Sequence, residues 1–306
     1  GGISFLVIRD GWGTAQVVLE QGQQCAIRVD ELTTESVVAV EGDVIANSQA
    51  PDGIELHQPS LTLVSPVYEP APVTISKRTL NAAIPTLLEH AAVENRHPHR
   101  RAIFRLASAV MHSFRSILYR RDFTEVQTPK FLAAATESVA NLFTFDYFGK
   151  PAYLAQSPQF YKQIMVGVFE RVFEVGPVFR AEPHDTARHV NEYVSLDVEF
   201  GFIEDHFTVM ALLRDVLHHI FTEIATSFAT DLKLAGAAVP TVPGVIPHIH
   251  FLTAQALLGE KHGVNLAGEL DLSPQHERWL GEWAQDTFAS DFLFVTGYPM
   301  EKRPFY

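Results

Sequence analysis

The most informative part of the sequence is VFRAEPHDTARHVNEYVSLDVEF, residues 178–200. In its second half apolar and polar residues alternate, and a β-strand places two such sets on opposite faces. The residues expected on the polar face are Tyr193, Ser195, Asp197 and Glu199. Arg180 and Glu182 share parity on a preceding predicted strand, and the pattern therefore predicts two strands joined by a charged loop.

This charged hairpin has two interpretations that the pattern alone leaves open. One is an ordinary solvated hairpin, and the other is a site for an anionic ligand. In the second interpretation, Arg180 and Arg188 grip phosphate groups through bidentate hydrogen bonds. Tyr193 would then stack on a base, and the carboxylates of the polar face would hold an amino group.

Around the hairpin, the sequence predicts helices and strands that do not alternate as regular βαβ units. Apolar residues from Ile103 to Leu118 fall on one helical stripe, and Ser157-Pro158 is typical of a helix start. The other expected elements are a strand at 123–126 closed by Pro129, strands at 172–175 and 178–180 broken by Gly176-Pro177, helices over 204–228 and from Ser273-Pro274, and a strand at 292–296. The predicted fold class is α+β, with an antiparallel or mixed sheet flanked by helices.

The amino-terminal part differs from the rest in its sequence pattern. Residues 1–66 contain short strand-like runs separated by turn residues, which predicts a small β-barrel. Residues 67–95 are rich in proline and are expected to be a linker or hinge, with a short helix at about 80–90. Residues 96–306 would form the large second domain.

Composition narrows the possible classes of protein. With 47% hydrophobic and 19% charged residues, 306 residues can build a sizeable core and are not expected to be disordered. The net charge of −13 argues against general nucleic-acid binding, so an RNA partner has to be argued from local sites. The single Cys25 excludes an internal disulfide and fits a cytoplasmic location. No apolar run is long enough for a membrane span.

The hairpin residues are similar to motif 2 of class II aminoacyl-tRNA synthetases. The resemblance is carried by Phe179-Arg180-Ala181-Glu182 and by the run from Arg188-His189 to Glu199, in a form similar to the archaeal-type aspartyl-tRNA synthetases. It implies that Arg180 is catalytic and contacts the α-phosphate of ATP and the aspartyl carboxylate. The other implied contacts are Glu182 and His189 with ATP, Arg188 with its γ-phosphate, Tyr193 with adenine, and Asp197 with the substrate ammonium.

A second match is the run Tyr153-Leu154-Ala155-Gln156-Ser157-Pro158-Gln159-Phe160-Tyr161-Lys162. In the aspartyl family this signature recognises the amino acid. The resemblance implies that Ser157 and Gln159 help to hold the ammonium, and that Lys162 pairs with the side-chain carboxylate. A lone lysine on a helix is usually a solvated surface charge, but here the whole signature is present. Asparaginyl relatives have Ser-Gly-Gln and lack the lysine, so the match favours aspartate.

A third match lies at residues 135–143, which resemble the flipping loop of the family. Glu137 stands where the family has the glutamate that binds the substrate amino group. Ser138-Val139 replaces the Gly-Gly that often follows, which would make this loop stiffer.

Residues 112–129 resemble motif 1, a long helix followed by a strand that ends in proline. The family uses motif 1 as its dimer interface, so the resemblance implies a homodimer.

The predicted barrel resembles the OB-fold anticodon-binding domain of the family. Phe5 and Gln16 have the spacing of residues on its anticodon-binding face. An exposed aromatic on such a face stacks on a base at about 1–3 kcal/mol. A core position for Phe5 is the alternative, and the first barrel strand is expected to be missing.

The resemblance implies an aspartate–tRNA ligase that uses ATP and Mg²⁺ and charges tRNA(Asp), with tRNA(Asn) left open as a second substrate. The Gly-rich motif 3 and the late acidic residues expected to hold Mg²⁺ do not occur in the 306 residues. The chain is therefore expected to be a fragment that is inactive or severely impaired by itself. No protein metal site is predicted, because the histidine pairs at 97–99 and 248–250 have no nearby Cys or acidic partners.

Two alternatives remain. One is an asparaginyl-tRNA synthetase or a paralogue that makes asparagine from aspartyl-adenylate, although residues 1–66 argue against the paralogue, which is expected to lack the barrel. The other is a non-catalytic RNA-binding fragment that has kept the fold.

Overall fold

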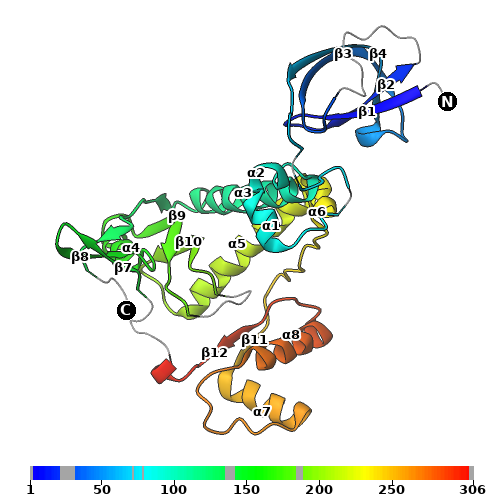
Figure 1. Cartoon of the computed structure of the whole chain (residues 1–306). Coiled ribbons are helices and arrows are strands. Elements are labelled where there is room, and N and C mark those ends of the chain that lie inside the picture. Colours follow the sequence, from blue (N-terminus) through cyan, green and yellow to red (C-terminus); the bar gives the residue numbers. More distant parts are fainter. Residues whose placement is uncertain are drawn as a thin grey trace. The chain divides into compact units, whose positions relative to one another are not determined.

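Four strands form the curved sheet of the first of two units, Gly1–His97 and Pro98–Tyr306 (Figure 1). They are β1 (Ile3–Arg9), β2 (Thr14–Glu20), β3 (Val37–Ala46) and β4 (Ile54–Ser65), with a 3-10 turn, η2 (Pro51–Gly53), before β4. The sheet order is β1-β2-β4-β3, and only the β2–β4 pairing is parallel. The computed structural model describes residues 3–20, 32–70, 72–77, 79–134, 142–183 and 189–302.

β4 is one long strand, whereas the sequence predicts only short strands in this region. The chain passes through Gln58, at a φ of 49°, and Pro59 without leaving the sheet. The register shifts opposite this point, between Glu41 and Asp43 of β3. Gly42 lies at the shift, where a Cβ atom would come 2.8 Å from the carbonyl oxygen of His57. Two residues of β4, Gln58 and Pro59, thus lie opposite the single Gly42 of β3, so the bulge is in β4.

The residues after β4 belong to the same unit. They include two short helices, α1 (Ile84–Glu89) and α2 (Ala91–Glu94), in the region where one short helix is predicted. Glu35 accepts hydrogen bonds from Arg9 on β1, at 2.8 Å, and from Arg96, at 2.9 Å. This shared carboxylate ties the end of the unit to its sheet.

The second unit is built around a mixed three-stranded sheet and two long helices. The sheet order is β10 (Glu192–Phe200), β9 (Arg171–Phe179) and β5 (Thr124–Glu125). β10 and β9 are antiparallel, whereas β9 and β5 are parallel. The helices are α3 (Pro98–Tyr119) and α5 (His206–Ser227), both close to their predicted ranges. Asp205 begins α5 by accepting hydrogen bonds from the N–H groups of Phe207 and Thr208.

The core of this unit lies between the two helices and the sheet. Its buried side chains come from α3, β9, α5 and Phe123 just before β5, and β10 contributes partly buried ones. Its buried members are Ala109, Phe114, Leu118, Phe123, Phe173, Val175, Leu212, Val216, Ile220 and Ile224. The apolar stripe predicted for residues 103–118 therefore packs as expected through Phe114 and Leu118.

One sequence prediction for the sheet is wrong. β9 is continuous across Gly176-Pro177, because β5 pairs only with Val172 and Phe173 and thus makes no ladder bond at the proline. Val194 belongs to the predicted apolar face, but its side chain is 53% exposed. Leu196, Val198 and Phe200 of that face do pack against the core.

The remaining elements form smaller groups. A second sheet has the order β6 (Phe131–Leu132), β8 (Lys150–Leu154) and β7 (Thr144–Tyr147), and α4 (Gln159–Phe169) and α6 (Ala229–Ala235) are the other helices before residue 240. The last group comprises β11 (His248–His250), α7 (Phe251–His262), α8 (Pro274–Phe288), β12 (Phe294–Thr296) and the 3-10 turn η3 (Met300–Lys302). Trp279 and Trp283 of α8 pack against its buried cluster, as predicted.

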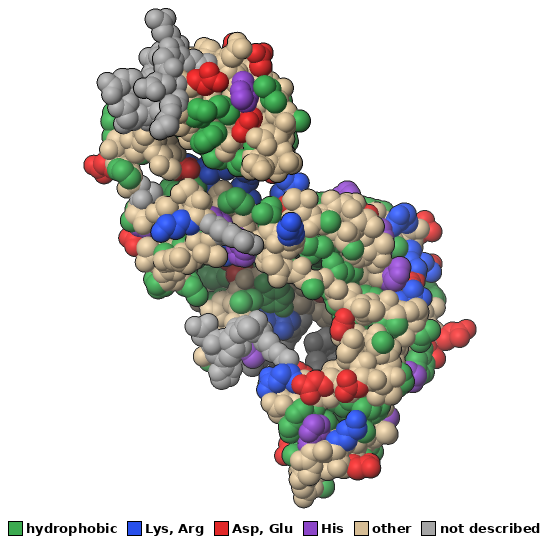
Figure 2. Space-filling view, turned by 90° about the vertical axis from the view of Figure 1, so that its right-hand side faces the viewer, with side chains coloured by type: hydrophobic (Ala, Val, Ile, Leu, Met, Phe, Trp, Pro, Cys, Tyr) green, Lys and Arg blue, Asp and Glu red, His purple; other side chains and the backbone are tan. Residues whose placement is uncertain are grey.

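Acidic, basic and histidine side chains are interspersed on the face shown in Figure 2. Within the described ranges, no helix is long and apolar enough to cross a membrane.

Candidate active site

The polar face of β10 is the base of the candidate site. The β9–β10 register places Asp197 opposite Glu174 and Ser195 opposite Gly176. Cross-strand partners project to the same side of a sheet, and alternate residues of one strand also share a face. Tyr193, Asp197 and Glu199 therefore share this face with Glu174, while Leu196 and Val198 project to the core.

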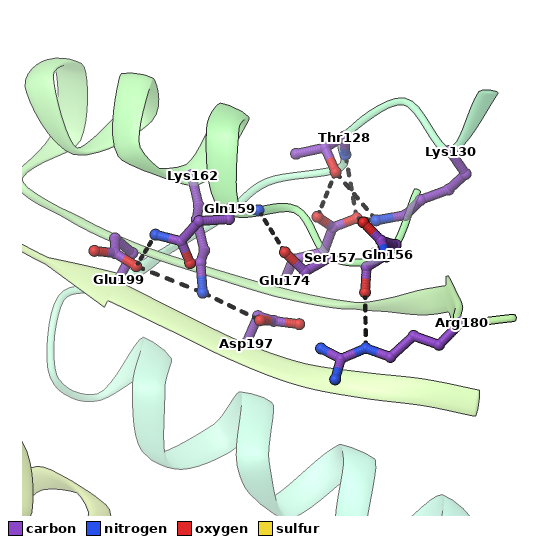
Figure 3. A network of polar contacts seen from close by, with 10 residues as sticks. All are labelled: Thr128, Lys130, Gln156, Ser157, Gln159, Lys162, Glu174, Arg180, Asp197 and Glu199. Atoms are coloured by element: carbon purple, nitrogen blue, oxygen red, sulfur yellow. Dashed lines mark hydrogen bonds and ion pairs between the residues drawn. The ribbon is translucent and has the colours of Figure 1, made fainter. Parts of the chain in front are cut away.

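Lys162 reaches this face from α4. Its Nζ atom donates to Asp197 Oδ1 at 3.1 Å and lies 3.5 Å from Glu199 Oε2. Lys162 is only 8% exposed, so its charge is neutralised mainly by these two carboxylates and little by water. Gln159, one turn earlier on α4, donates to Glu199 Oε2 at 3.5 Å. Figure 3 shows this group of side chains above the strands.

The start of α4 brings the predicted recognition residues to the site. Ser157 is buried, and its Oγ accepts a hydrogen bond from the N–H of Gln159 at 3.1 Å. The helix begins at Gln159 with Pro158 in the capping position, one residue later than the sequence predicts. Because Pro158 is fully buried, the loop before the helix is held by packing as well as by hydrogen bonds.

Arg180 approaches from the end of β9. Its backbone N–H donates to the carbonyl of Asn191 at 2.9 Å, and its side-chain Nε donates to the carbonyl of Gln156 at 3.4 Å. β9 ends at Phe179, so Arg180 and Glu182 lie just beyond the strand and not on it as predicted. In the view of Figure 3, Asp197 lies between the Lys162 amine and the Arg180 guanidinium.

The structure thus brings together five of the predicted residues: Ser157, Gln159, Lys162, Arg180 and Asp197. Tyr193 is partly buried on β10, opposite Val178, and Glu182 and His189 lie in the connection between the strands. Glu137 and Arg188 lie outside the described residues. The roles assigned to all these side chains stay predictions.

Sequence reasoning missed a buried pair beside the site. Glu174 is 1% exposed, and Lys130 Nζ lies 2.8 Å from its Oε1 atom. A signal was available, because Glu174 is the one charged residue in the apolar run 172–175. A carboxylate in a buried strand needs a cationic or hydrogen-bonding partner. Its partner is 44 positions earlier, which no local pattern can identify.

A hollow of about 310 Å³ lies elsewhere, between α3 and α5. Its lining includes Arg121, Arg214, Asp215 and His219. Both arginines pair with Asp215, so the positive charge of the hollow is partly neutralised within the protein. It shares no lining residue with the β10 face and is therefore not the candidate site.

The predicted anticodon residues lie on one face of the first unit. Val7 pairs with Gln16 across β1 and β2, so Phe5 and Gln16 project to the same side. Phe5 is 58% exposed, which contradicts its alternative assignment to the core. Gln16 Nε2 donates to Glu55 Oε1 at 2.8 Å. Hydrogen bonds from His57 and Asn47, and then from Gln16, lower the pKa of Glu55.

Comparison of the sequence with known protein families identifies the family of each part of the chain. Residues 84–306 match the family described as tRNA synthetases class II (D, K and N). The chain belongs to this family. The OB-fold nucleic acid binding domain matches residues 1–64, which confirms the predicted barrel, and the synthetase therefore has both predicted parts.

Curated relatives align with the synthetase over its entire length. It is 45% identical to the aspartate–tRNA(Asp/Asn) ligase of Deinococcus radiodurans, covering 68% of that protein. It is 44% identical to the enzyme of the same name from Thermus thermophilus, covering 70% of it.

Solved structures give the same fold. Asparaginyl-tRNA synthetase from Pyrococcus horikoshii, complexed with asparaginyl-adenylate, has a TM-score of 0.85 at 28% identity, over 99% of this chain and 69% of that one. A putative aspartyl-tRNA synthetase from Leishmania major has a TM-score of 0.81 at 28% identity, over 100% and 70% of the respective chains.

Proposed function

We propose that this synthetase is an aspartate–tRNA ligase. The α-carboxylate of aspartate attacks the α-phosphorus of ATP, which forms aspartyl-adenylate and releases pyrophosphate. The aspartyl group then passes to a hydroxyl at the 3′ end of tRNA(Asp), and AMP leaves. The names of the curated relatives support this function, and they also support tRNA(Asn) as a second acceptor.

The observation that carries the choice of amino acid is the buried pairing of Lys162 with Asp197. Without substrate, each charge satisfies the other, so no buried charge is left unpaired. Aspartate carries both matching groups. Its ammonium replaces Lys162 as the partner of Asp197, and its side-chain carboxylate replaces Asp197 as the partner of Lys162.

Asparagine would meet the same site differently. Its ammonium can pair with Asp197, but its amide side chain carries no charge to neutralise Lys162. A cationic group left in a buried site without a counter-charge is a strong element of discrimination. The site is therefore proposed to reject asparagine because its amide would leave Lys162 with only the more distant and more exposed Glu199 as a counter-charge.

Arg180 is the proposed catalytic residue. Its guanidinium stabilises the negative charge that develops on the α-phosphate, by charge-assisted hydrogen bonds. Glu182, Arg188, His189 and Tyr193 are proposed to hold the rest of the nucleotide. Ser157, Gln159 and Glu137 are proposed to hold the substrate ammonium together with Asp197.

The anticodon contacts, the pairing of two copies, the cellular location and the use of Mg²⁺ are also proposed. Phe5 and Gln16 would contact the anticodon, two copies would pair through residues 112–129, and the protein would work in the cytoplasm, in agreement with its single cysteine. Mg²⁺ would arrive with ATP. The described part of the chain has no group of three or more His, Cys, Asp or Glu residues that could hold a metal ion.

A titration tests the proposed function. The probes are sulfamoyl analogues of aspartyl-, asparaginyl- and lysyl-adenylate, in which a sulfamate replaces the reactive phosphate linkage. Calorimetry is expected to show tightest binding of the aspartyl compound, by at least about tenfold, equivalent to about 1.4 kcal/mol. Equal affinities, or a preference for either of the other two compounds, would remove the assignment to aspartate.

A further inference from the structure

We propose that Glu174 and Lys130 are positioning residues, which set the geometry of the amino-acid and ATP subsites by holding the segments that carry the binding residues. This inference rests on the proposed function, and neither residue would touch substrate. Glu174 is almost completely buried, whereas Lys130 is partly buried. Their Nζ–Oε1 distance is 2.8 Å, as expected for a charge-assisted hydrogen bond.

The Glu174 carboxylate is the centre of a small network. Its Oε1 atom accepts from the backbone N–H of Thr128 at 3.2 Å, and its Oε2 atom accepts from the Thr128 hydroxyl at 2.7 Å. Lys130 Nζ also donates to that hydroxyl at 3.1 Å. Both carboxylate oxygens are thus engaged, and the segment 128–130 is fixed against β9 (Figure 3).

The sequence leaves room for this network at Gly176. A Cβ atom there would lie 3.0 Å from Glu174 Oε1 and 3.5 Å from Lys130 Cε. A side chain at position 176 would therefore press on both members of the pair. The absence of a side chain lets Lys130 lie close to the strand.

A chain of contacts connects the pair to Arg180. The carbonyl of Lys130 accepts from the N–H of Ala155 at 2.9 Å, directly after the β6–β8 ladder. The carbonyl of Ala155 accepts from the N–H of Phe179 at 2.9 Å, and the next carbonyl, of Gln156, accepts from Arg180 Nε. A shift of residues 128–130 would therefore displace the acceptor that orients Arg180.

A second connection runs through charge. Glu174 and Asp197 are directly opposite each other on β9 and β10, where side chains of one face are neighbours and like charges repel. Each carboxylate has its own cation, Lys130 for Glu174 and Lys162 for Asp197. The four charged side chains therefore follow one another in the order Lys130, Glu174, Asp197, Lys162, with the two carboxylates between the two lysines. Neutralising Glu174 leaves Lys130 without its charged partner and draws Asp197 away from Lys162.

The experiment uses three variants of the whole chain: Lys130→Met, Glu174→Gln and the two combined. Calorimetry measures affinity for the sulfamoyl analogue of aspartyl-adenylate, and urea unfolding measures stability. Each single variant is expected to lose stability and to bind the analogue at least about tenfold more weakly. In the double variant no unpaired buried charge remains, so stability is expected to return largely, while affinity stays low because the segment is no longer held.

The different responses of stability and affinity in the double variant distinguish a positioning role from a purely structural one. If the pair only stabilises the fold, affinity in the double variant recovers together with stability, and that result overturns the inference. Single variants that bind normally overturn it as well. Asp231→Asn is the matched control, because Asp231 is a buried carboxylate paired with Arg105 on α3, and its loss should reduce stability alone. If the unmutated chain fails to bind the analogue, the proposed function itself fails.

Discussion

Lys162 Nζ lies between two carboxylates of one strand, 3.1 Å from Asp197 Oδ1 and 3.5 Å from Glu199 Oε2. The amine comes from α4 and the carboxylates from β10, so helix and strand are joined at the site by charge. Two negative groups around one buried cation leave an excess of negative charge, which suits a ligand that brings its own ammonium group.

Replacing Lys162 with methionine is expected to remove the preference for aspartate. The apolar stem is kept, but the substrate carboxylate meets Asp197 and Glu199 without a cation between them. Affinity for the aspartyl analogue should fall at least about tenfold, or about 1.4 kcal/mol, while ATP binds as before. Calorimetry with each ligand gives both values. Lys261→Met on the exposed end of α7 is the control, and an unchanged affinity in Lys162→Met would remove this lysine from recognition.

Replacing Arg180 with glutamine is expected to weaken ATP binding. A hydrogen bond to a charged group contributes about 1.5–3 kcal/mol, which corresponds to roughly a tenfold to hundredfold loss of affinity. Equilibrium titration with ATP measures the change. The exposed Arg278 on α8, changed to glutamine, should bind ATP normally. If the two variants bind ATP equally well, Arg180 is not a nucleotide contact.

Phe5→Ala tests the anticodon face of the first unit. Because this ring is more than half exposed, its loss should leave the unfolding temperature nearly unchanged. A lost base stack should reduce affinity for tRNA(Asp) by about 1–3 kcal/mol. Filter binding at fixed salt concentration measures the affinity for tRNA(Asp). Trp12→Ala at the β1–β2 turn is the matched control, since that aromatic is 90% exposed. Equal losses in the two variants would refute a specific role for Phe5.

Glu35 should make the stability of the first unit depend on pH. Burial alone would raise its pKa, but hydrogen bonds and charge from Arg9 and Arg96 outweigh burial and lower the pKa below the usual 4.5. A carboxyl whose pKa is lowered on folding stabilises the protein above pH 4.5, and the stabilisation is lost as pH falls through the folded-state value.

Urea unfolding between pH 7 and pH 3 checks this expectation. At pH 7 the free energy of unfolding of the wild type should exceed that of Glu35→Gln by about 1 kcal/mol or less, because these ion pairs lie near the surface. The difference should become smaller as the pH falls. The exposed Glu41→Gln on β3 serves as the control. A gap between wild type and Glu35→Gln that stays constant with pH would contradict the assignment.

Much of the fold could be predicted, because its signals are local. The stripe on α3 and the alternation on β10 each lie within one segment. The continuous course of β9 through Pro177 could not be predicted, since it depends on how far the neighbouring β5 extends. The exposure of Val194 likewise depends on what packs against β10, and not on its own sequence.

The candidate site was predicted only in part, for the same physical reason. Lys162 and Asp197 were found through motifs, and the structure places them in contact. The motifs give no indication that these two residues bind each other in the absence of substrate. The pairing of Glu174 with Lys130 joins a strand to a distant turn, so it depends on tertiary structure.

A crystal structure with the sulfamoyl analogue of aspartyl-adenylate tests the central claim most directly. The aspartyl carboxylate is predicted to contact Lys162 Nζ, the ammonium to contact Asp197, and the sulfamate to lie within reach of Arg180. The distance between Lys162 and Asp197 should increase from its present 3.1 Å as the ligand enters between them. A ligand bound elsewhere, or one that leaves this pair intact and makes no contact with Lys162, would contradict the account.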